Sequence, residues 1–287
     1  MSKELTPDIV EKDYWRNNDQ FADLFNAVLF NGESVIQSDS LEELDTEESS
    51  VVENKDYAES LKKSRDVLKI SKQLVDSGLQ LSILGIEDQQ LVHYAMPMRV
   101  MGYDYLAYKK QYDSNAIKYA GKEKRKEYGL TTDEFFSRMK QTDKFAPVIT
   151  IVIYYGDKAW DGAKRLHEML EIPPRLLPFV SDYTLNLVEA RNNSFIFHNK
   201  NNKDLFELTK ILLSEYLNAK EIRQKVEAYC REHKVDRSVI RMVSVALNAR
   251  INYGEIKEDG DMCTVFEEIR AEAKLEGRLE GKMEGTE

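Results

Sequence analysis

The most apolar stretch of the sequence is APVITIVIYY, residues 146–155. Its side chains are mostly β-branched or aromatic and are largely apolar at both odd and even positions, which is typical of a strand covered on both faces. The stretch is too short to cross a bilayer, which takes about 20 apolar residues, and no other run approaches that length. The sequence therefore predicts a central strand in a sheet with helices on both sides, and no membrane partner.

Two further segments, residues 65–75 and 79–88, are rich in apolar and β-branched side chains and predict strands. The triplet Asp-Ser-Gly between them is typical of a turn, so we expect an antiparallel hairpin. A loop of residues 75–78, which has a common hairpin length, places Leu74 opposite Leu79.

The register of this hairpin decides where its polar side chains fall. Continued outward from the loop, the pairing places Ile70 opposite Ile83 and then Asp66 directly opposite Glu87. Side chains that oppose each other on one face of a sheet have Cβ atoms about 4.5–5.5 Å apart. Gln89 follows on the same face as Glu87, because the side chains of a strand alternate. The apolar face of the hairpin is therefore expected to end in two carboxylates and an amide.

Two neighbouring carboxylates at the end of an apolar face repel each other and resist desolvation. A divalent cation removes both difficulties. Mg²⁺ prefers oxygen ligands and is usually held by one or two carboxylates together with a substrate phosphate; we expect Mn²⁺ to be able to substitute. The ion would promote hydrolysis of a phosphodiester, with Gln89 orienting the water. The alternative is that Asp66 and Glu87 merely pair with lysines at a sheet edge.

The segments on either side of the hairpin differ in character. Residues 21–29 repeat apolar side chains at helical spacing, with Asn18 or Asp19 as a suitable N-cap. Residues 33–60 are acidic, contain serine and have few apolar side chains, so we expect an exposed loop. Residues 91–145 are expected to be helical.

The rest of the chain predicts one strand and several helices. We expect a helix at residues 163–171, a short strand at 183–190 and helices from residue 203 onward. The C-terminal repeat KLEGRLEGKMEG has three glycines at four-residue spacing, and Gly costs a helix about 1 kcal/mol relative to Ala. Either a self-association strip or a frayed charged tail accounts for it. The order of elements predicts an α/β core with a helical appendage.

The net charge of −10 is distributed unevenly. Residues 1–60 contain sixteen acidic and four basic side chains, whereas residues 99–144 contain seven acidic and eleven basic ones. Nucleic-acid phosphates are bound mainly by Lys and Arg, so the second region keeps a nucleic-acid partner open despite the acidic total. A solvated helix face explains the basic run at residues 122–126 equally well.

Five segments occur in a specific order within residues 12–200: FADLFNAVLFNGE, RD, SILGIEDQ, HYAMPMRVMGYDYLAYKKQY and VITIVIYYGDKAWDG. Together they resemble the PD-(D/E)XK nuclease family transposases, which include the recombination-promoting nucleases. The resemblance implies an α/β fold with a restriction-endonuclease-like core, a mixed central sheet flanked by helices, over residues 1–200. A helical C-terminal region would follow over residues 201–287. The implied activity is that of a Mg²⁺-dependent DNA endonuclease acting in DNA recombination or mobility.

The resemblance also implies functional residues. The family has an Asp on one hairpin strand and E-x-K or E-x-Q on the next, which match Asp66, Glu87 and Gln89. The metal site of this fold also uses the backbone carbonyl between the second acid and the Lys or Gln, here that of Asp88. Many members carry a further acid on the first helix, for which Asp23 is the best candidate. Gln89 has no charge and cannot act as a base, which favours slow cleavage.

The helix expected after the hairpin interleaves tyrosines with basic side chains. Arg99 is the candidate for contact with phosphate or with the active site, and Lys109 and Lys110 are candidates for DNA contact. Core packing explains the tyrosines equally well. His93 has no second His or Cys nearby and is more typical of a structural histidine than of a general base or a zinc ligand.

Three functions remain open: a metal-dependent DNA endonuclease, a DNA-binding protein with a nuclease fold but little catalytic power, and a protein-interaction module. An endonuclease that cuts both strands of a duplex needs two active sites or two visits, so we expect a homodimer. The two cysteines are far apart and the chain starts without a basic and apolar leader, which favours a cytoplasmic protein.

Overall fold

The computed structural model describes residues 7–44, 66–75, 78–192 and 194–246. Within these ranges the chain is an α/β protein whose five strands form one mixed sheet. The strands are β1 (Leu41–Glu43), β2 (Val67–Val75), β3 (Gly78–Gln89), β4 (Val148–Tyr154) and β5 (Asn186–Glu189). The helices are α1 (Pro7–Arg16), α2 (Asn18–Phe30), α3 (Met96–Lys118), α4 (Lys122–Glu127), α5 (Thr132–Ser137), α6 (Lys200–Leu212), α7 (Ala219–Glu232) and α8 (Arg237–Ala246).

The sheet follows the order of the chain, β1-β2-β3-β4-β5. β1, β2 and β3 are antiparallel neighbours, whereas β4 and β5 run parallel to β3. β4 lies between β3 and β5, and all but one of its residues are buried. The inner strand that the apolar stretch predicts is therefore confirmed, as is the mixed sheet.

The predicted register of the β2–β3 hairpin is also confirmed. Leu74 pairs with Leu79, and Ile70 pairs with Ile83. The loop is shorter than the predicted 75–78, because Val75 and Gly78 still pair and only two residues separate the strands. The register is nevertheless the predicted one, because the loop is shorter than predicted by one residue on each side.

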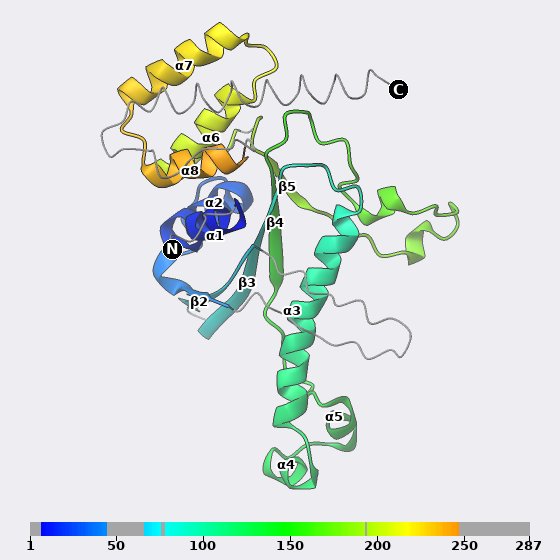
Figure 1. Ribbon diagram of the computed structural model, residues 1–287. Coiled ribbons are helices and arrows are strands. Elements are labelled where there is room, and N and C mark those ends of the chain that lie inside the picture. Colours follow the sequence, from blue (N-terminus) through cyan, green and yellow to red (C-terminus); the bar gives the residue numbers. More distant parts are fainter. Residues whose placement is uncertain (1–6, 45–65, 76–77, 193, 247–287) are drawn as a thin grey trace, which may run out of the picture.

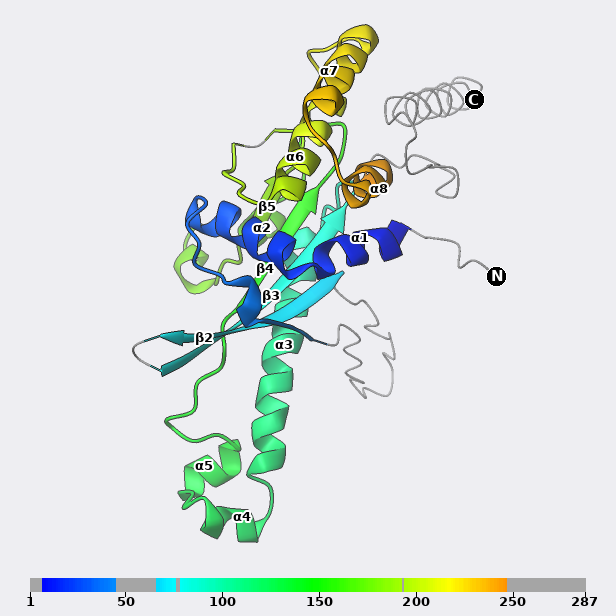
Figure 2. The same cartoon turned by 90° about the vertical axis from the view of Figure 1, so that its left-hand side faces the viewer.

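Helices cover both faces of the sheet (Figures 1 and 2). α3 lies along one face, where side chains of β2, β3, β4 and α3 form a small apolar cluster comprising Leu68, Ile83, Ala107 and Val148. On the other face lie α1 and α2, together with α6 and α8. The main core is on this side and includes Trp15, Phe21, Leu84, Ile151 and Leu205. Because strand side chains alternate, the two faces of β2 and β3 belong to two different environments.

The C-terminal helices pack on this core. The domain boundary expected at residue 200 coincides with the start of α6, and the division into two domains stays a prediction. Side chains of α6, α7 and α8 belong to the same hydrophobic cluster as those of α1, α2 and β4. In addition, the Nε2 of Gln90, just after β3, donates a hydrogen bond of 2.9 Å to the carbonyl of Val245 in α8. The helical region is thus tied to the strand that carries the predicted site.

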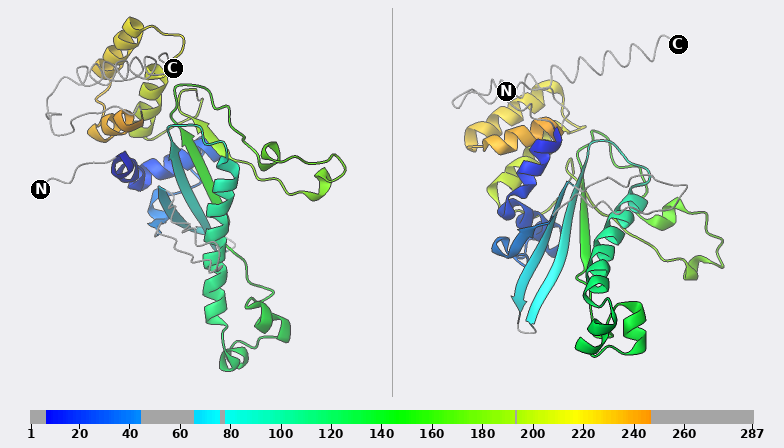
Figure 3. Two further views of the ribbon diagram at one scale, coloured as in Figure 1. Left: turned by 45° about the vertical axis from the view of Figure 1, so that its right-hand side comes forward. Right: turned by 60° about the horizontal axis from the view of Figure 1, so that its bottom comes forward.

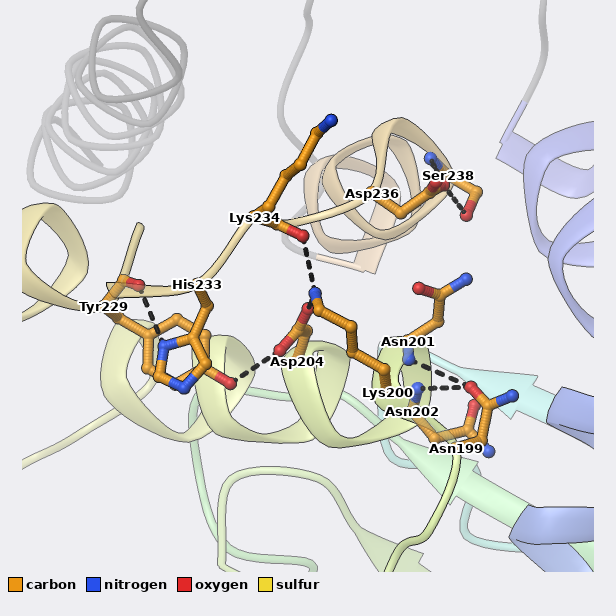
Figure 4. A network of polar contacts seen from close by, with 10 residues as sticks. All are labelled: Asn199, Lys200, Asn201, Asn202, Asp204, Tyr229, His233, Lys234, Asp236 and Ser238. Atoms are coloured by element: carbon orange, nitrogen blue, oxygen red, sulfur yellow. Dashed lines mark hydrogen bonds and ion pairs between the residues drawn. The ribbon is translucent and has the colours of Figure 1, made fainter. Parts of the chain in front are cut away.

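A polar network fastens α6 to α7 and to the segment before α8 (Figure 4). Asn199 caps α6 by accepting hydrogen bonds from two amides of its first turn. Asp204 is buried, forms an ion pair with Lys200 and accepts a hydrogen bond of 2.8 Å from the hydroxyl of Tyr229. Burial and the neighbouring Asp204 raise the pKa of Tyr229. Lys200 also donates to the carbonyl of Lys234, which ties the connection between α7 and α8 to α6.

Two segments do not have the conformation expected for them, because their backbone pairs with that of neighbouring segments. Within residues 33–60, expected to form a loop, β1 adds an edge strand to the sheet by pairing with β2, and Leu41 is buried there. Residues 163–171 contain only the 3₁₀ helix Leu166–Met169 where an α-helix is expected. The reason is that the backbone at the start of this segment hydrogen-bonds with Tyr183 and its neighbours.

Two element boundaries also differ from expectation. The N-cap of α2 is Asn17, whose side chain accepts hydrogen bonds from two helix amides, whereas Asn18 and Asp19 lie inside the helix. The strand expected at residues 183–190 is limited to β5. Residues 45–60 of the acidic segment and the C-terminal repeat lie outside the described residues. In the part of the chain that is described, no helix has the length and apolar character needed to cross a membrane.

Lys69 is a buried cation at the junction of α1 and α2. From β2, its Nζ donates hydrogen bonds of 2.6 Å to the carbonyl of Arg16 and to Oδ1 of Asn18. The same Nζ lies 4.8 Å from the centre of the Phe21 ring. Burial lowers the pKa of Lys69 to about 8, whereas in the unfolded chain it is close to 10.5.

This difference predicts a pH dependence of stability. Between about pH 8 and 10.5 the unfolded chain binds more protons at Lys69 than the folded chain, so the free energy of unfolding should rise with pH, by roughly 3 kcal/mol in all. Lys69→Met should remove this rise, whereas Lys72→Met, at an exposed position of the same strand, should keep it. Urea unfolding at pH 7.5 and pH 10 measures the effect. An equal difference between parent and Lys69→Met at both pH values would contradict the assignment.

Candidate active site

The two predicted carboxylates meet at the end of the β2–β3 hairpin. The last paired residues are Val67 and Ile86, so Asp66 lies just before β2 and beside Glu87 of β3. The Oδ2 of Asp66 accepts a hydrogen bond of 2.8 Å from the N–H of Asp88. Glu87 is only 1% exposed although it is ionisable. The hairpin therefore brings an acid from each strand to one place, as the register predicts.

Gln89 and Arg99 complete this cluster. The Nε2 of Gln89 donates to Oε1 of Glu87 at 3.1 Å and to the carbonyl oxygen of Asp88 at 2.7 Å. Arg99 reaches from the first turn of α3 and places its Nη2 2.6 Å from the same Oε1 of Glu87. Its Nε donates a hydrogen bond of 2.7 Å to the hydroxyl of Tyr103, one turn further along the helix. The predicted residues Glu87, Gln89 and Arg99 are thus in direct contact.

The charges of this cluster act on one another. Burial opposes the charge of Arg99, but the neighbouring Glu87 carboxylate and Tyr103 raise the pKa of Arg99 overall. Burial and the charge of Glu87 also raise the pKa of the Tyr103 hydroxyl. The negative charge of Asp66 adds to both shifts. Tyr103 therefore keeps its proton and remains a hydrogen-bond donor.

The side chain of Asp88 lies on the opposite face, towards α1. Burial and the negative charges of Glu11, Asp66 and Glu87 raise the pKa of Asp88 well above its usual range. Burial likewise raises the pKa of the neighbouring Tyr155 hydroxyl. Asp88 therefore contributes only its main chain to the α3-side cluster, where its N–H donates to the Asp66 carboxylate and its carbonyl accepts from the Gln89 amide.

Asp23 has its partners elsewhere. Its Oδ1 accepts a hydrogen bond of 2.7 Å from the N–H of His198, and its Oδ2 accepts one of 2.9 Å from the side chain of Asn202. These bonds fasten α2 to the start of α6. The acid of the N-terminal helices that acts electrostatically on Asp88 is Glu11 of α1, which was not among the predicted residues.

The remaining candidates also lie outside the cluster. Lys109 is ten residues beyond Arg99, about 15 Å further along α3, and forms an ion pair with Asp113. Lys110 is its exposed neighbour. His93 lies in the connection between β3 and α3, where its carbonyl accepts a hydrogen bond from the first residue of α3. Of the predicted residues, the structure therefore brings together the side chains of Asp66, Glu87, Gln89 and Arg99 and the main chain of Asp88.

The cluster contains oxygen atoms of the kind that Mg²⁺ binds. Among the described residues, no group of three or more His, Cys, Asp or Glu side chains is placed to hold a metal ion. Two carboxylates and the carbonyl of Asp88 are nevertheless hard oxygen ligands, and Mg²⁺ often takes one or two carboxylates and completes its shell with water and substrate phosphate. Gln89 can turn its amide so that oxygen rather than nitrogen faces such an ion.

The chain matches no protein-family model, no curated protein and no solved structure. A functional assignment therefore depends on the geometry of this cluster and on the order of the sequence segments.

Proposed function

We propose that the chain is a metal-dependent DNA endonuclease with a restriction-endonuclease-like core, of the PD-(D/E)XK type, acting in DNA recombination or mobility. The observation that carries this proposal is the position of Asp66 and Glu87. They come from adjacent antiparallel strands and lie side by side with Gln89 and Arg99 at one end of the hairpin. Such a set combines oxygen ligands for a cation with a cationic group for phosphate.

Each residue then has a role in hydrolysis. Asp66, Glu87 and the Asp88 carbonyl would hold Mg²⁺, which when bound polarises the phosphate and makes a nearby water more acidic. The Gln89 amide orients the attacking water, and Arg99 binds non-bridging phosphate oxygens through its Nη donors. The water oxygen bonds to phosphorus and gives up a proton to solvent, the opposite P–O bond breaks, and the leaving oxygen takes up a proton from solvent.

A second candidate is a DNA-binding protein with little catalytic power. The Gln89 amide and the Arg99 guanidinium both bind Oε1 of Glu87, so each competes with a cation for this atom. Gln89 also brings no charge to stabilise a developing anion. Both features favour slow cleavage.

Incubation of supercoiled plasmid with purified protein separates these candidates. The endonuclease nicks plasmid with Mg²⁺ or Mn²⁺ and leaves it intact in EDTA. Linear product in place of nicked circles would indicate two sites acting together, as in the expected homodimer. Intact plasmid with retained DNA binding favours the second candidate. If the protein neither cleaves nor binds DNA, a protein-interaction module remains.

Replacement of Gln89 by lysine tests whether this position limits catalysis. Lysine adds a positive charge and a group able to transfer protons, so Gln89→Lys should raise the single-turnover cleavage rate by about tenfold or more. Gln89→Met, of similar size but without polar groups, should lower it. The assigned role of Gln89 is wrong if both variants cleave at the parental rate at saturating Mg²⁺.

A further inference from the structure

α3 continues past the edge of the sheet and carries α4 and α5 at its far end (Figures 1 and 3). We call residues 109–145, which comprise the second half of α3, α4, α5 and the return to β4, the arm. The arm contains ten basic and six acidic side chains, a net charge of +4 in a chain whose total is −10. Positive charge is thus concentrated on a part of the chain that projects from the body.

Three lysines gather around one aromatic ring at the tip of the arm. The Nζ atoms of Lys118, Lys124 and Lys140 lie 5.5, 5.7 and 5.8 Å from the centre of the Tyr128 ring. Of these three, only Lys124 has a carboxylate at ion-pair distance among the described residues, Glu127 at 2.7 Å. Three cations that share one ring concentrate positive charge at the tip, which favours an anionic ligand.

Two arginines are fixed beside the lysines in the same way. The guanidinium carbons of Arg125 and Arg138 lie 5.4 and 4.5 Å from the centre of the Phe135 ring. Arg138 also donates a hydrogen bond of 2.8 Å to the carbonyl of Tyr119, and Arg125 donates one of 3.0 Å to the hydroxyl of Thr132. These contacts hold the planar cations in place before any ligand arrives, which lowers the entropy cost of binding.

Two acidic side chains of the tip, Glu134 and Asp143, hydrogen-bond within the tip itself. Glu134 forms a capping box with Thr131 and accepts a further hydrogen bond from the amide of Gln141. Asp143 accepts hydrogen bonds from the Tyr119 hydroxyl and from the amide of Lys140. Both carboxylates therefore stabilise the shape of the tip, and among the described residues neither forms an ion pair with Lys118 or Lys140.

Distance from the body favours binding of a long polyanion at this tip. Residues 7–44 carry nine acidic and two basic side chains, and this excess of negative charge would repel nucleic acid. Fixed charges in water are screened over about 8 Å at physiological salt. α3 has 23 residues and is therefore about 35 Å long, so the tip lies several screening lengths from its other end.

The distance from the site to the tip of the arm is close to a repeat of DNA. Arg99, which contacts Glu87, and Lys118, where the lysine cluster begins, are about 29 Å apart along α3, and Lys124 and Lys140 belong to the segments after α3. One helical turn of B-DNA covers about 34–36 Å, and a duplex presents the same strand to points one turn apart. We propose that the tip of the arm binds the phosphate backbone of duplex DNA about one helical turn from the bond on which the site acts. This inference rests on the proposed DNA substrate.

Fluorescence anisotropy with labelled duplexes in EDTA tests the inference, because binding is then measured without cleavage. The full chain is compared with K118Q/K124Q/K140Q at about 0.1 M salt. The variant should bind a duplex of about 30 base pairs at least tenfold more weakly, and the slope of log affinity against log salt should become shallower by about 2 to 3. K203Q/K210Q/K220Q, which removes the same charge from exposed positions of α6 and α7, should bind as the parent does. K118R/K124R/K140R should retain affinity.

Duplex length gives a second readout. A duplex of about 8 base pairs, at about 3.4 Å each, is too short to reach both the site and the tip. The affinity gap between the long and short duplexes should therefore be smaller in K118Q/K124Q/K140Q than in the parent. Parental affinity of this variant for the long duplex, or an equal loss in K203Q/K210Q/K220Q, would overturn the inference and favour an acidic protein as the ligand of the tip.

The binding experiment tests the arm independently of the plasmid experiment, which tests cleavage. Intact plasmid together with arm-dependent binding refutes cleavage and supports the arm. Metal-dependent cleavage together with unchanged binding of the lysine variant supports the site and refutes the arm.

Discussion

Asp66→Ala and Glu87→Ala are each expected to reduce metal-dependent plasmid cleavage by at least about a hundredfold. Loss of a partner one shell outside a metal already costs 10–100-fold in many sites, and these two carboxylates would touch the ion itself. The cluster offers no third acidic side chain to replace either one among the residues described. Nicking and linearisation of supercoiled plasmid over time, at saturating Mg²⁺, give the rates.

Isosteric and distant variants control for folding. Asp66→Asn and Glu87→Gln keep shape and hydrogen-bonding capacity but remove the charge, so they should be nearly as inactive as the alanine variants. Asp39→Ala, at an exposed position before β1, should cut as the parent does. Binding of Mn²⁺, followed by electron paramagnetic resonance, should weaken in the Asp66 and Glu87 variants. Parental cleavage by either alanine variant would remove the residue from the site.

The hairpin could be predicted from sequence because its determinants are local. A turn triplet and alternating side chains fix the register, and the register alone brings Asp66 beside Glu87. The inner position of β4 follows in the same way from an apolar pattern on both faces. The site residues that lie on these strands were therefore accessible without a structure.

The N-terminal helices show where this approach fails. α1 packs its Val10, Tyr14 and Trp15 into the core, yet it is only ten residues long and mixes these with charged side chains. Without that helix, Glu11 had no predicted neighbours, and Asp23 was the only acid on the predicted helix at residues 21–29. The Pro at its start and the apolar spacing from Val10 to Tyr14 were the available signals.

Contacts between distant segments were less accessible still. Arg99 could be proposed as a phosphate ligand from its charge, but its ion pair with Glu87 depends on how α3 packs against the sheet. The lysines that gather on Tyr128 are separated by up to 22 residues, from Lys118 to Lys140, and meet only because α4 and α5 fold back at the end of α3. A run of basic letters therefore indicated the charge of the arm but not its arrangement.

Arg99→Ala is expected to lower the free energy of unfolding in the absence of metal by about 3 kcal/mol. Removal of one partner of a buried ion pair costs about 3–5 kcal/mol, and Arg99 lies at the lower end because its side chain is 23% exposed while that of Glu87 is 2% exposed. In a Glu87→Gln background the same substitution should cost much less, because no buried carboxylate loses its counter-charge. Urea unfolding of the four proteins in EDTA measures this coupling.

Mg²⁺ should restore part of the stability that Arg99→Ala loses. This effect distinguishes a metal site from an ordinary ion pair. Arg99 binds the Glu87 oxygen that a cation would use, so the parent must give up this contact when it binds Mg²⁺, whereas Arg99→Ala has nothing to give up. The ion should therefore raise the melting temperature of Arg99→Ala more than that of the parent, since a ligand stabilises in proportion to its affinity for the folded state. Addition of Asp66→Ala should abolish the extra shift. Equal shifts in parent and Arg99→Ala would mean that Arg99 and the ion do not share Glu87, and Arg99 would then act on phosphate alone.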